Sequence, residues 1–403
     1  MIRNITNVRG IKCWGAHTGV KSMRRDLALI YSEVPAAAAA TLTQNKVQAE
    51  PIKLTQKHLK NNRAQVIVCN AGNANACTGA QGRLGAEAMA DAVAEMLGIS
   101  PEDVIVASTG LIGERFPTEE VVEGIKINIP KLSNDTKAGS FVANAILTTD
   151  TFAKEGFVGF DSDGITINLG GVAKGSGMIH PNMATMLAFV VTDFSIGEKL
   201  LQETLKFCVD RSFNMITVDG DTSTNDMVAI MANGMAENKK VTSKDDPAYL
   251  PFRDKLLELL THLAKLIVSD GEGASKFIEY RVSKARSEKN ARKLVRAISD
   301  SSLVKTAMFG RDPNWGRIIA ACGNAGIPFS YKKANLYIGD NNNLVLVLKR
   351  GTPTDFDKNY MKKLLRESNI RVHLEVNTGK EEGIGWGSDL TTDYVLFNSV
   401  YTT

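Results

Sequence analysis

Residues 183–191, with the sequence MATMLAFVV, constrain the fold of this chain more than any other segment. Every residue in this run except Thr185 is apolar. A run of this length and composition is typical of a β-strand whose two faces are both buried. We therefore expect a sheet that is covered by other layers on both sides.

Shorter patterns elsewhere predict the strands and helices that accompany this run. Aliphatic runs and alternating residues predict strands at residues 26–34, 66–69, 104–107 and 165–169. Helices are predicted at residues 84–97, 252–267 and 287–297, the last of them exposed because it is rich in charge. A hairpin is expected over residues 336–348. This mixture favours an α/β or α+β protein with several layers.

The composition is that of an ordinary globular protein. The chain has 403 residues, of which 43% are hydrophobic and 23% charged, so we expect two or three domains. A formal net charge of +4 is too small to indicate a nucleic-acid partner. No apolar run reaches membrane-spanning length and the first residues lack the apolar centre of a signal peptide. We therefore expect a cytoplasmic protein with no membrane partner.

The five cysteines are widely spaced and form no pattern of metal ligands. We expect all five to be buried free thiols, and we expect neither a metal nor a bound cofactor. Three carboxylates cluster at Asp219, Asp221 and Asp226, but their spacing differs from that of a calcium-binding EF-hand loop. We predict that they support turns near the active site.

The glycine-rich segment 170–177 precedes the apolar run and is the best candidate for chemistry. It differs from a nucleotide-binding Walker loop, because Lys174 stands before Gly175 and a strand rather than a helix follows. The alternative is that Thr185 acts as a nucleophile, which requires a base to take the proton of its hydroxyl.

A cut between Ala184 and Thr185 would supply that base. Thr185 would then carry a free α-amine, whose pKa of about 7.7–8.0 suits a general base. The same hydroxyl could make the cut, by attacking the Ala184 carbonyl to form an ester that water then hydrolyses. From the residue pattern alone, however, a threonine in an apolar strand is more often a packed side chain, and both interpretations stay open.

A set of longer motifs resembles the glutamate N-acetyltransferase family, whose members are also called ornithine acetyltransferases. Residues 174–187, KGSGMIHPNMATML, resemble the motif at which that family cuts itself. Five further segments match in the family's order along the chain: VCNAGNANACTG at 68–79, STGLIG at 108–113, ITVDGDTSTND at 216–226, SDGEGA at 269–274 and GRDPNWGR at 310–317. The matches extend over essentially the whole chain.

The resemblance implies a fold and a chain organisation. The family fold has two sheets sandwiched between helices, like that of a self-cleaving aminopeptidase family, and a smaller C-terminal α/β domain. Self-cleavage before Thr185 would yield an α chain of residues 1–184 and a β chain of residues 185–403. Residues 185–285 would complete the sandwich, and residues 286–403 would form the smaller domain. Two α and two β chains are expected to assemble into a heterotetramer.

The resemblance also implies a reaction and the residues that perform it. Family members transfer acetyl from N-acetylornithine to glutamate in arginine biosynthesis, and some also take acetyl from acetyl-CoA. Thr185 would be the nucleophile, with Thr109 and Gly110 as the oxyanion hole. The substrate-binding residues would be Thr148, Lys174, Thr185, Glu272, Asn398 and Thr403.

Two other functions account for fewer of these motifs. An aminopeptidase or amidase would use water in place of glutamate, and an amino-acid-binding protein would remain uncut. The chain also departs from the family at Thr402, where an arginine is usual. That difference bears on how the end of the chain would contact the substrate.

Overall fold

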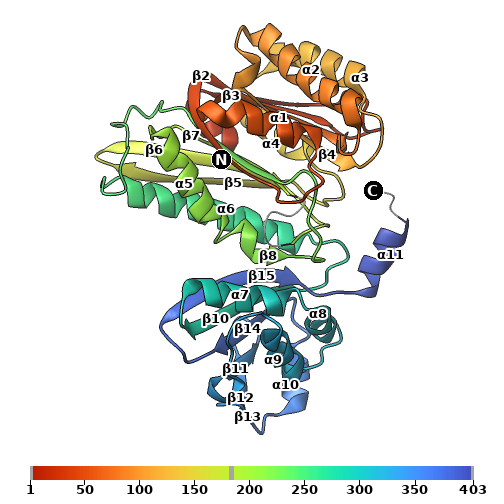
Figure 1. The fold of residues 1–403 in the computed structure, drawn as a ribbon, viewed down its shortest axis with the longest axis vertical. Helices are drawn as coiled ribbons and strands as arrows, with labels where there is room; N and C mark the ends of the chain where they lie inside the picture. The colour runs from red at the N-terminus through yellow and green to blue at the C-terminus, as the bar shows by residue number, and fades with distance from the viewer. Residues whose placement is uncertain (1–2, 181–185, 401–403) are drawn as a thin grey trace.

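The computed structural model describes residues 3–180 and 186–400, which form two β-sheets flanked by helices (Figure 1). The first sheet has the strand order β4–β3–β2–β9–β7–β6–β5, with β1 paired to β2. Its strands are β1 (Ile11–Ala16), β2 (Leu27–Leu42), β3 (Arg63–Asn73), β4 (Val104–Leu111), β5 (Lys154–Ser162), β6 (Ile165–Lys174), β7 (Leu187–Thr192) and β9 (Met227–Ala232).

The second sheet has the order β13–β12–β11–β14–β10–β15–β8 and belongs mainly to the C-terminal part of the chain. Its strands are β8 (Ile216–Thr217), β10 (Phe277–Ala285), β11 (Asn335–Gly339), β12 (Leu344–Lys349), β13 (Thr352–Pro353), β14 (Asn369–Glu375) and β15 (Glu381–Ser388). The helices are α1 (Glu50–His58), α2 (Gly79–Leu97), α3 (Thr118–Asn128), α4 (Thr136–Ala145), α5 (Glu198–Val209), α6 (Tyr249–Ser269), α7 (Glu288–Ser299), α8 (Ser302–Phe309), α9 (Trp315–Gly323), α10 (Lys358–Leu364) and α11 (Thr392–Val400).

Strand β2 is long enough to take part in two β layers. Residues 27–31 and 36–37 pair with β3, and residues 37–42 pair with β9. The register with β3 shifts between Tyr31 and Ala36, which marks an irregularity in the middle of the strand. One half of the first sheet contains β1, β3 and β4, and the other half contains β9, β7, β6 and β5. Strand β2 belongs to both halves and joins them.

Alternate residues of these strands enter different cores, because successive side chains of a strand point to opposite faces. Phe189 of β7 and Ile67 of β3 belong to one buried cluster, which lies between the two halves of the sheet. Their neighbours face outward: Val190 packs in the core that contains α5 and α6, and Val68 in the core that contains α2 and α3. The order of layers is therefore helix, β layer, β layer, helix.

This arrangement confirms the predicted fold class. Figure 1 shows α2 and α3 over one β layer at the top of the view, α5 and α6 beside the other, and the smaller α/β unit with the second sheet below. Strand β10 (Phe277–Ala285) pairs within this second sheet. The boundary at residue 285 and the cut between residues 184 and 185 stay predictions.

Most of the predicted elements are present with longer bounds. The predicted strands fall in β2, β3, β4 and β6, except that Asp26 directly precedes β2. Of the run 183–191, residues 187–191 form β7, and residues 183–185 lie outside the described part of the chain. Helix α2 ends at Leu97 and is capped by Gly98, whose φ of 68° is a left-handed conformation that glycine adopts without strain. The hairpin of β11 and β12 is also confirmed.

The prediction that the charged stretch 287–297 forms an exposed helix is wrong for one of its faces. Helix α7 buries Leu294, Val295 and Ile298 and packs against β10 and β15. These residues recur at helical spacing between the charged ones, so the helix has one apolar face and one charged face. The high content of charge hid that periodicity.

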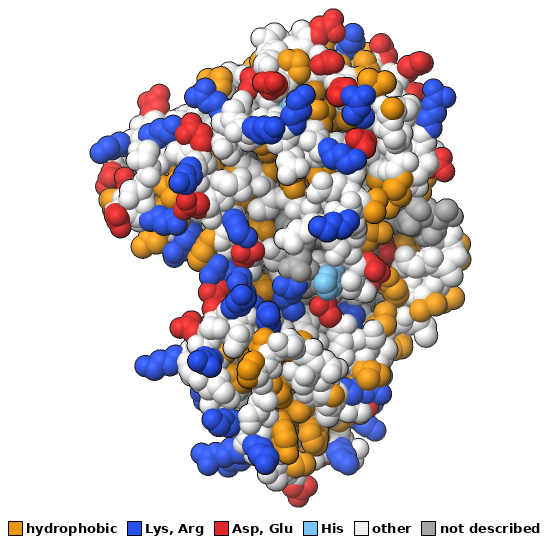
Figure 2. Space-filling view, viewed as in Figure 1, with side chains coloured by type: hydrophobic (Ala, Val, Ile, Leu, Met, Phe, Trp, Pro, Cys, Tyr) orange, Lys and Arg blue, Asp and Glu red, His pale blue; other side chains and the backbone are white. Residues whose placement is uncertain are grey.

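The prediction that all five cysteines are buried is wrong for Cys77, which is exposed in the loop before α2. The other four are buried free thiols. Basic and acidic side chains are interspersed over the visible face of the molecule (Figure 2), in keeping with the small net charge. Among the described residues, no helix combines the length and the apolar character needed to cross a bilayer.

We predict that Leu263→Ala lowers the free energy of unfolding by about 2–5 kcal/mol, because Leu263 is fully buried in the core between α6 and the sheet. Leu250→Ala on the same helix is the matched control, since that side chain is 49% exposed. Urea denaturation of both variants measures the difference. Equal stability losses for the two variants would contradict the assigned packing of α6.

Candidate active site

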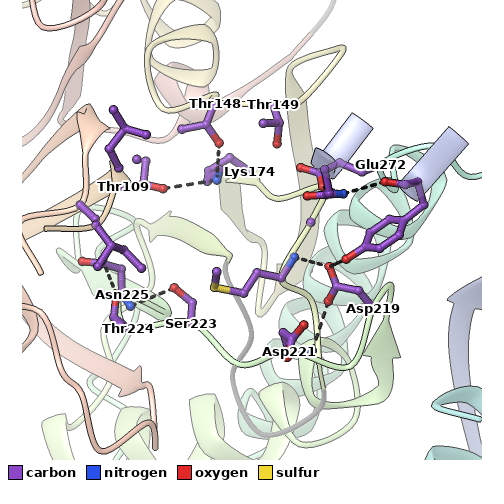
Figure 3. Close-up of a pocket in the computed structure, with 18 residues that line it drawn as sticks. Thr109, Thr148, Thr149, Lys174, Asp219, Asp221, Ser223, Thr224, Asn225 and Glu272 are labelled. Atoms are coloured by element: carbon purple, nitrogen blue, oxygen red, sulfur yellow. Dashed lines mark hydrogen bonds between the residues drawn. The ribbon is translucent and has the colours of Figure 1, made fainter. Parts of the chain in front are cut away.

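A pocket lies where the ends of β4 and β6 meet the turn after α6 and the first turns of α11 (Figure 3). Its lining includes residues that the sequence predicts: Thr109, Gly110, Thr148, Lys174, Glu272 and Asn398. These residues come from segments far apart in the chain, and the fold brings them into one cavity. Their chemical roles stay predictions. Ala184, Thr185 and Thr403 lie outside the described residues.

Lys174 is a buried cation at the wall of this pocket. Its side chain ends between two threonines, and Nζ donates to Thr148 Oγ1 at 2.8 Å and to Thr109 Oγ1 at 3.3 Å (Figure 3). An ammonium has three donors, so one is left for a ligand after these two bonds in the described part of the chain. Burial lowers the pKa of Lys174, and the negative charge of Asp150 opposes that effect.

The sheet places Lys174 at the start of β7. Lys174 is the last residue of β6, and its Cα pairs in register with that of Leu187. The described chain after residue 185 therefore begins beside Lys174. The predicted nucleophile precedes Leu187 by two residues in the sequence. The described part of the apolar run therefore begins close to Lys174, a residue that lines the pocket.

The backbone at Thr109 and Gly110 is held tightly against the neighbouring strand. Gly110 has a φ of +134°, a conformation that residues with a side chain rarely adopt. A Cβ atom at this position would lie 2.2 Å from the carbonyl carbon of Gly72 in β3. Only glycine fits here, and the close contact fixes the direction of the peptide groups at the end of β4.

Glu272 provides a carboxylate in the same pocket. Its backbone N–H donates to the carbonyl oxygen of Ser176 at 2.9 Å, which ties the turn after α6 to the glycine-rich segment. Its Oε2 accepts a hydrogen bond from Asn398 Nδ2 at 3.1 Å, so α11 is joined to the site. Glu272 and Lys174 are close enough for the carboxylate to favour the charged form of the lysine.

A basic side chain, Lys174, and an acidic side chain, Glu272, both line the pocket. An amino acid with its carboxylate near Lys174 and an ammonium near Glu272 would meet an opposite charge at each end. Thr109 and Gly110 supply a hydroxyl and a backbone N–H at the end of β4, the kinds of donor that stabilise an oxyanion. The arrangement therefore suits an acyl-transfer reaction on an amino-acid derivative.

Asp219 supports the turns around the pocket, as the sequence predicts. Its carboxylate accepts hydrogen bonds from the N–H groups of Met178 at 2.5 Å and Ile179 at 2.8 Å, and from the Tyr394 hydroxyl at 3.2 Å. Burial raises the pKa of Asp219, although the N–H donors of Asp221, Met178 and Ile179 oppose the effect. Asp219 thus connects α11 with the segment that leads to residue 181.

The complete burial of the Asp226 carboxyl group was not predicted from the sequence. It is fully buried, and its Oδ1 accepts a hydrogen bond from the N–H of Met186 at 3.0 Å. Among the described residues, its Oδ2 has no hydrogen-bond partner. Burial raises the pKa of Asp226 well above its ordinary value, and the Met186 N–H and the charge of Lys174 offset only part of this. The neighbouring Asp221 is exposed, and nothing in the sequence pattern distinguishes the two.

Within residues 3–180 and 186–400, no three His, Cys, Asp or Glu side chains gather as metal ligands would. This holds for Asp219, Asp221 and Asp226 as well. The Asp219 carboxylate and Asp226 Oδ1 accept their hydrogen bonds from N–H and hydroxyl donors.

Known proteins match the chain along almost its whole length. The sequence model of the ArgJ family matches residues 12–403. The arginine biosynthesis bifunctional protein ArgJ of Symbiobacterium thermophilum is 45% identical over 402 residues, which are 99% of this chain and 98% of that protein. The protein of the same name from Staphylococcus epidermidis is 46% identical over 401 residues, with 99% and 98% covered.

A solved structure is also similar. It is the crystal structure of ornithine acetyltransferase from Mycobacterium tuberculosis complexed with ornithine. The sequence identity is 34%, the match covers 44% of this chain and 95% of that one, and the TM-score is 0.39.

We predict that Asp226→Asn stabilises the protein at neutral pH but not in acid. A carboxyl whose pKa is raised by folding binds its proton more tightly in the folded state. Stability is therefore lost as the pH rises above about 4, where the unfolded chain ionises and the folded chain does not. Asparagine does not ionise, and its side-chain oxygen can still accept from Met186.

The measurement is the Tm of wild type and Asp226→Asn between pH 4 and pH 7. The variant's advantage should grow as the pH rises. Asp221→Asn, on the same loop but exposed, is the control and should show no such trend. An advantage for Asp226→Asn that is constant or shrinks with rising pH would show that Asp226 is not held in its neutral form.

Proposed function

The chain belongs to the ArgJ family, and on that premise we propose that it transfers acetyl from N-acetylornithine to glutamate in arginine biosynthesis. The observation that carries the proposal is the pocket in which Lys174 and Glu272 lie together beside Thr109 and Gly110. The first pair suits the two charged groups of an amino acid, and the second pair suits the oxyanion of an acyl transfer.

The enzyme is proposed to process itself before it acts. The Thr185 hydroxyl attacks the carbonyl carbon of Ala184, and the acyl group moves from the Thr185 nitrogen to its oxygen. Water then hydrolyses this ester and leaves a free α-amine on Thr185. The two products are an α chain of residues 1–184 and a β chain of residues 185–403.

The sheet topology supports a stable complex of these two chains. Strands β7 and β9 would belong to the β chain, yet they lie in the sheet between β2 and β6 of the α chain. Both neighbours are joined to them by backbone hydrogen-bond ladders. The cut chains would therefore remain parts of one folded unit.

Acetyl transfer follows in two displacements. The Thr185 hydroxyl attacks the acetyl carbonyl of N-acetylornithine while its own α-amine takes the proton. The Thr109 hydroxyl and the Gly110 N–H stabilise the oxyanion, and the C–N bond breaks as ornithine receives the proton. The amine of glutamate then attacks acetyl-Thr185 and regenerates the hydroxyl.

The remaining substrate contacts follow from the charges of the pocket. Lys174 holds a substrate carboxylate with Thr148 beside it, and Glu272 and Asn398 meet the ammonium group. The relatives carry the name bifunctional, so we propose that acetyl-CoA is a second acetyl donor. The assembly of two α and two β chains, the contacts of Thr403 and a cytoplasmic location stay predictions.

We predict that Thr185→Ala abolishes both self-cleavage and acetyl transfer, because alanine has no hydroxyl to attack either carbonyl. Intact mass spectrometry should show two chains for the wild type and one full-length chain for the variant. Assay of glutamate acetylation by N-acetylornithine completes the test. Acetyl transfer by Thr185→Ala at the wild-type rate would refute the mechanism.

A second prediction concerns the oxyanion hole. Thr109→Ala should lower kcat about 10²–10³-fold with a smaller change in KM, since an oxyanion donor acts mainly in the transition state. Rates are to be divided by the cleaved fraction, so that slow processing is not mistaken for slow transfer. Thr166→Ala, at the other end of β6 and exposed, should leave kcat unchanged. If Thr109→Ala lowers kcat by less than about threefold, Thr109 is not an oxyanion donor.

A further inference from the structure

Lys154 is a second buried cation close to the pocket, although it does not line it. It is the first residue of β5, and its side chain is completely buried. Nζ donates to Asp150 Oδ1 at 2.7 Å, to Asp270 Oδ2 at 2.6 Å and to the carbonyl oxygen of Phe152 at 3.3 Å. The three donors of the ammonium are therefore all used inside the protein.

The Asp150 arm of this network reaches the residues around Lys174. Asp150 Oδ1 also accepts from the N–H of Gly175 at 2.6 Å, directly after Lys174 in the chain. Its Oδ2 accepts from the N–H of Thr148 at 3.1 Å. Although burial raises the pKa of Asp150, the charges of Lys174 and Lys154 hold it below its ordinary value. Asp150 thus holds the backbone of Gly175, which follows Lys174, and the backbone of Thr148, whose hydroxyl accepts from Lys174.

The Asp270 arm reaches the turn that carries Glu272. Asp270 directly follows α6, and its Oδ2 accepts from the N–H of Thr151 at 2.9 Å. Its Oδ1 accepts a hydrogen bond from the Thr151 hydroxyl. Glu272 follows Asp270 by two residues. Lys154 therefore connects the backbone around Lys174 with the backbone around Glu272.

We propose that Lys154 is a positioning residue that fixes the distance between the Lys174 ammonium and the Glu272 carboxylate, and thereby selects the length of the amino acid that binds between them. The inference rests on the proposed function, which assigns Lys174 and Glu272 to the two charged groups of ornithine. A buried network with every donor satisfied is rigid, because any movement that breaks one hydrogen bond leaves a buried polar group without a partner.

The proposed cut gives this network a further consequence. Asp150 and Lys154 would belong to the α chain, and Asp270 to the β chain. The ion pair of Lys154 with Asp270 would then join the two chains directly behind the pocket. The spacing of the two binding charges would be set by a contact across the chain boundary, since Lys174 and Glu272 also lie on different chains.

The test is to break the Asp270 arm and measure selectivity for length. Asp270→Ala removes that arm but leaves Lys154 paired with Asp150, so no isolated buried charge remains. The Kd values for ornithine and for lysine, which is one methylene longer, are measured by isothermal titration calorimetry on the full protein. One methylene commonly changes recognition by about 10–200-fold. For wild type, we expect the Kd for lysine to exceed the Kd for ornithine at least about tenfold. For Asp270→Ala, we expect this ratio of Kd values to be less than about threefold.

Two further variants separate positioning from general destabilisation. Asp270→Asn should restore the wild-type ratio, because the amide oxygen can accept from Lys154 and Thr151 while the amide nitrogen donates to the Thr151 hydroxyl. Lys276→Met is the matched control, since Lys276 is also buried but donates to the Glu367 carbonyl, outside the pocket lining. It should lower Tm and leave the ratio unchanged.

The outcomes distinguish this inference from the proposed function. If Asp270→Ala keeps the wild-type ratio of the Kd values for lysine and ornithine and only its Tm is lowered, the network merely stabilises the protein. That result would overturn the inference. Wild type that binds ornithine and lysine equally, or binds neither, would overturn it too. Wild type that selects ornithine but transfers no acetyl to glutamate would contradict the proposed function alone.

Discussion

Strands β7 and β9 pack against apolar side chains on both faces, in the core between the two β layers and in the core that contains α5 and α6. A strand in this position has no contact with water, so helices must cover one side of it and another β layer the other. The long strand β2 makes this possible, because it pairs with β3 at one end and β9 at the other. The sandwich follows from that burial, and the pocket lies where the buried strands end.

The charged groups of the site are placed where the apolar layers stop. Lys174 and Lys154 are both buried, and each has an anion or hydroxyl within hydrogen-bond distance. A buried charge is tolerated only when partners replace its lost water, so the partners fix the surrounding loops. Asp226 is the exception: its surroundings favour the neutral form directly beside the residue that follows Thr185. The structure thus combines buried charges with a carboxyl group whose pKa is raised by burial, next to the residue that follows Thr185 in the sequence.

The sequence predicted what depends on local pattern and missed what depends on contacts between distant residues. The apolar run 183–191 was enough to predict a doubly buried strand, but the charge of α7 concealed its apolar face. Residue chemistry alone left Thr185 undecided, and family motifs were needed to select Lys174 and Glu272. The link from Lys154 to Asp270 spans 116 residues, and the burial of Asp226 arises only on packing. Neither has a signature in the sequence.

If acetyl passes through Thr185, the acetyl group can be located on this residue before it reaches glutamate. Wild-type protein is incubated with N-acetylornithine in the absence of glutamate, quenched in acid, digested and analysed by tandem mass spectrometry. We expect a peptide that begins at Thr185 and carries a hydroxylamine-sensitive acetyl on the threonine oxygen, and we expect this acetyl to be lost when glutamate is added. Acetyl on a different residue would contradict this mechanism. So would a digest in which every peptide that covers this region still contains the intact Ala184–Thr185 bond.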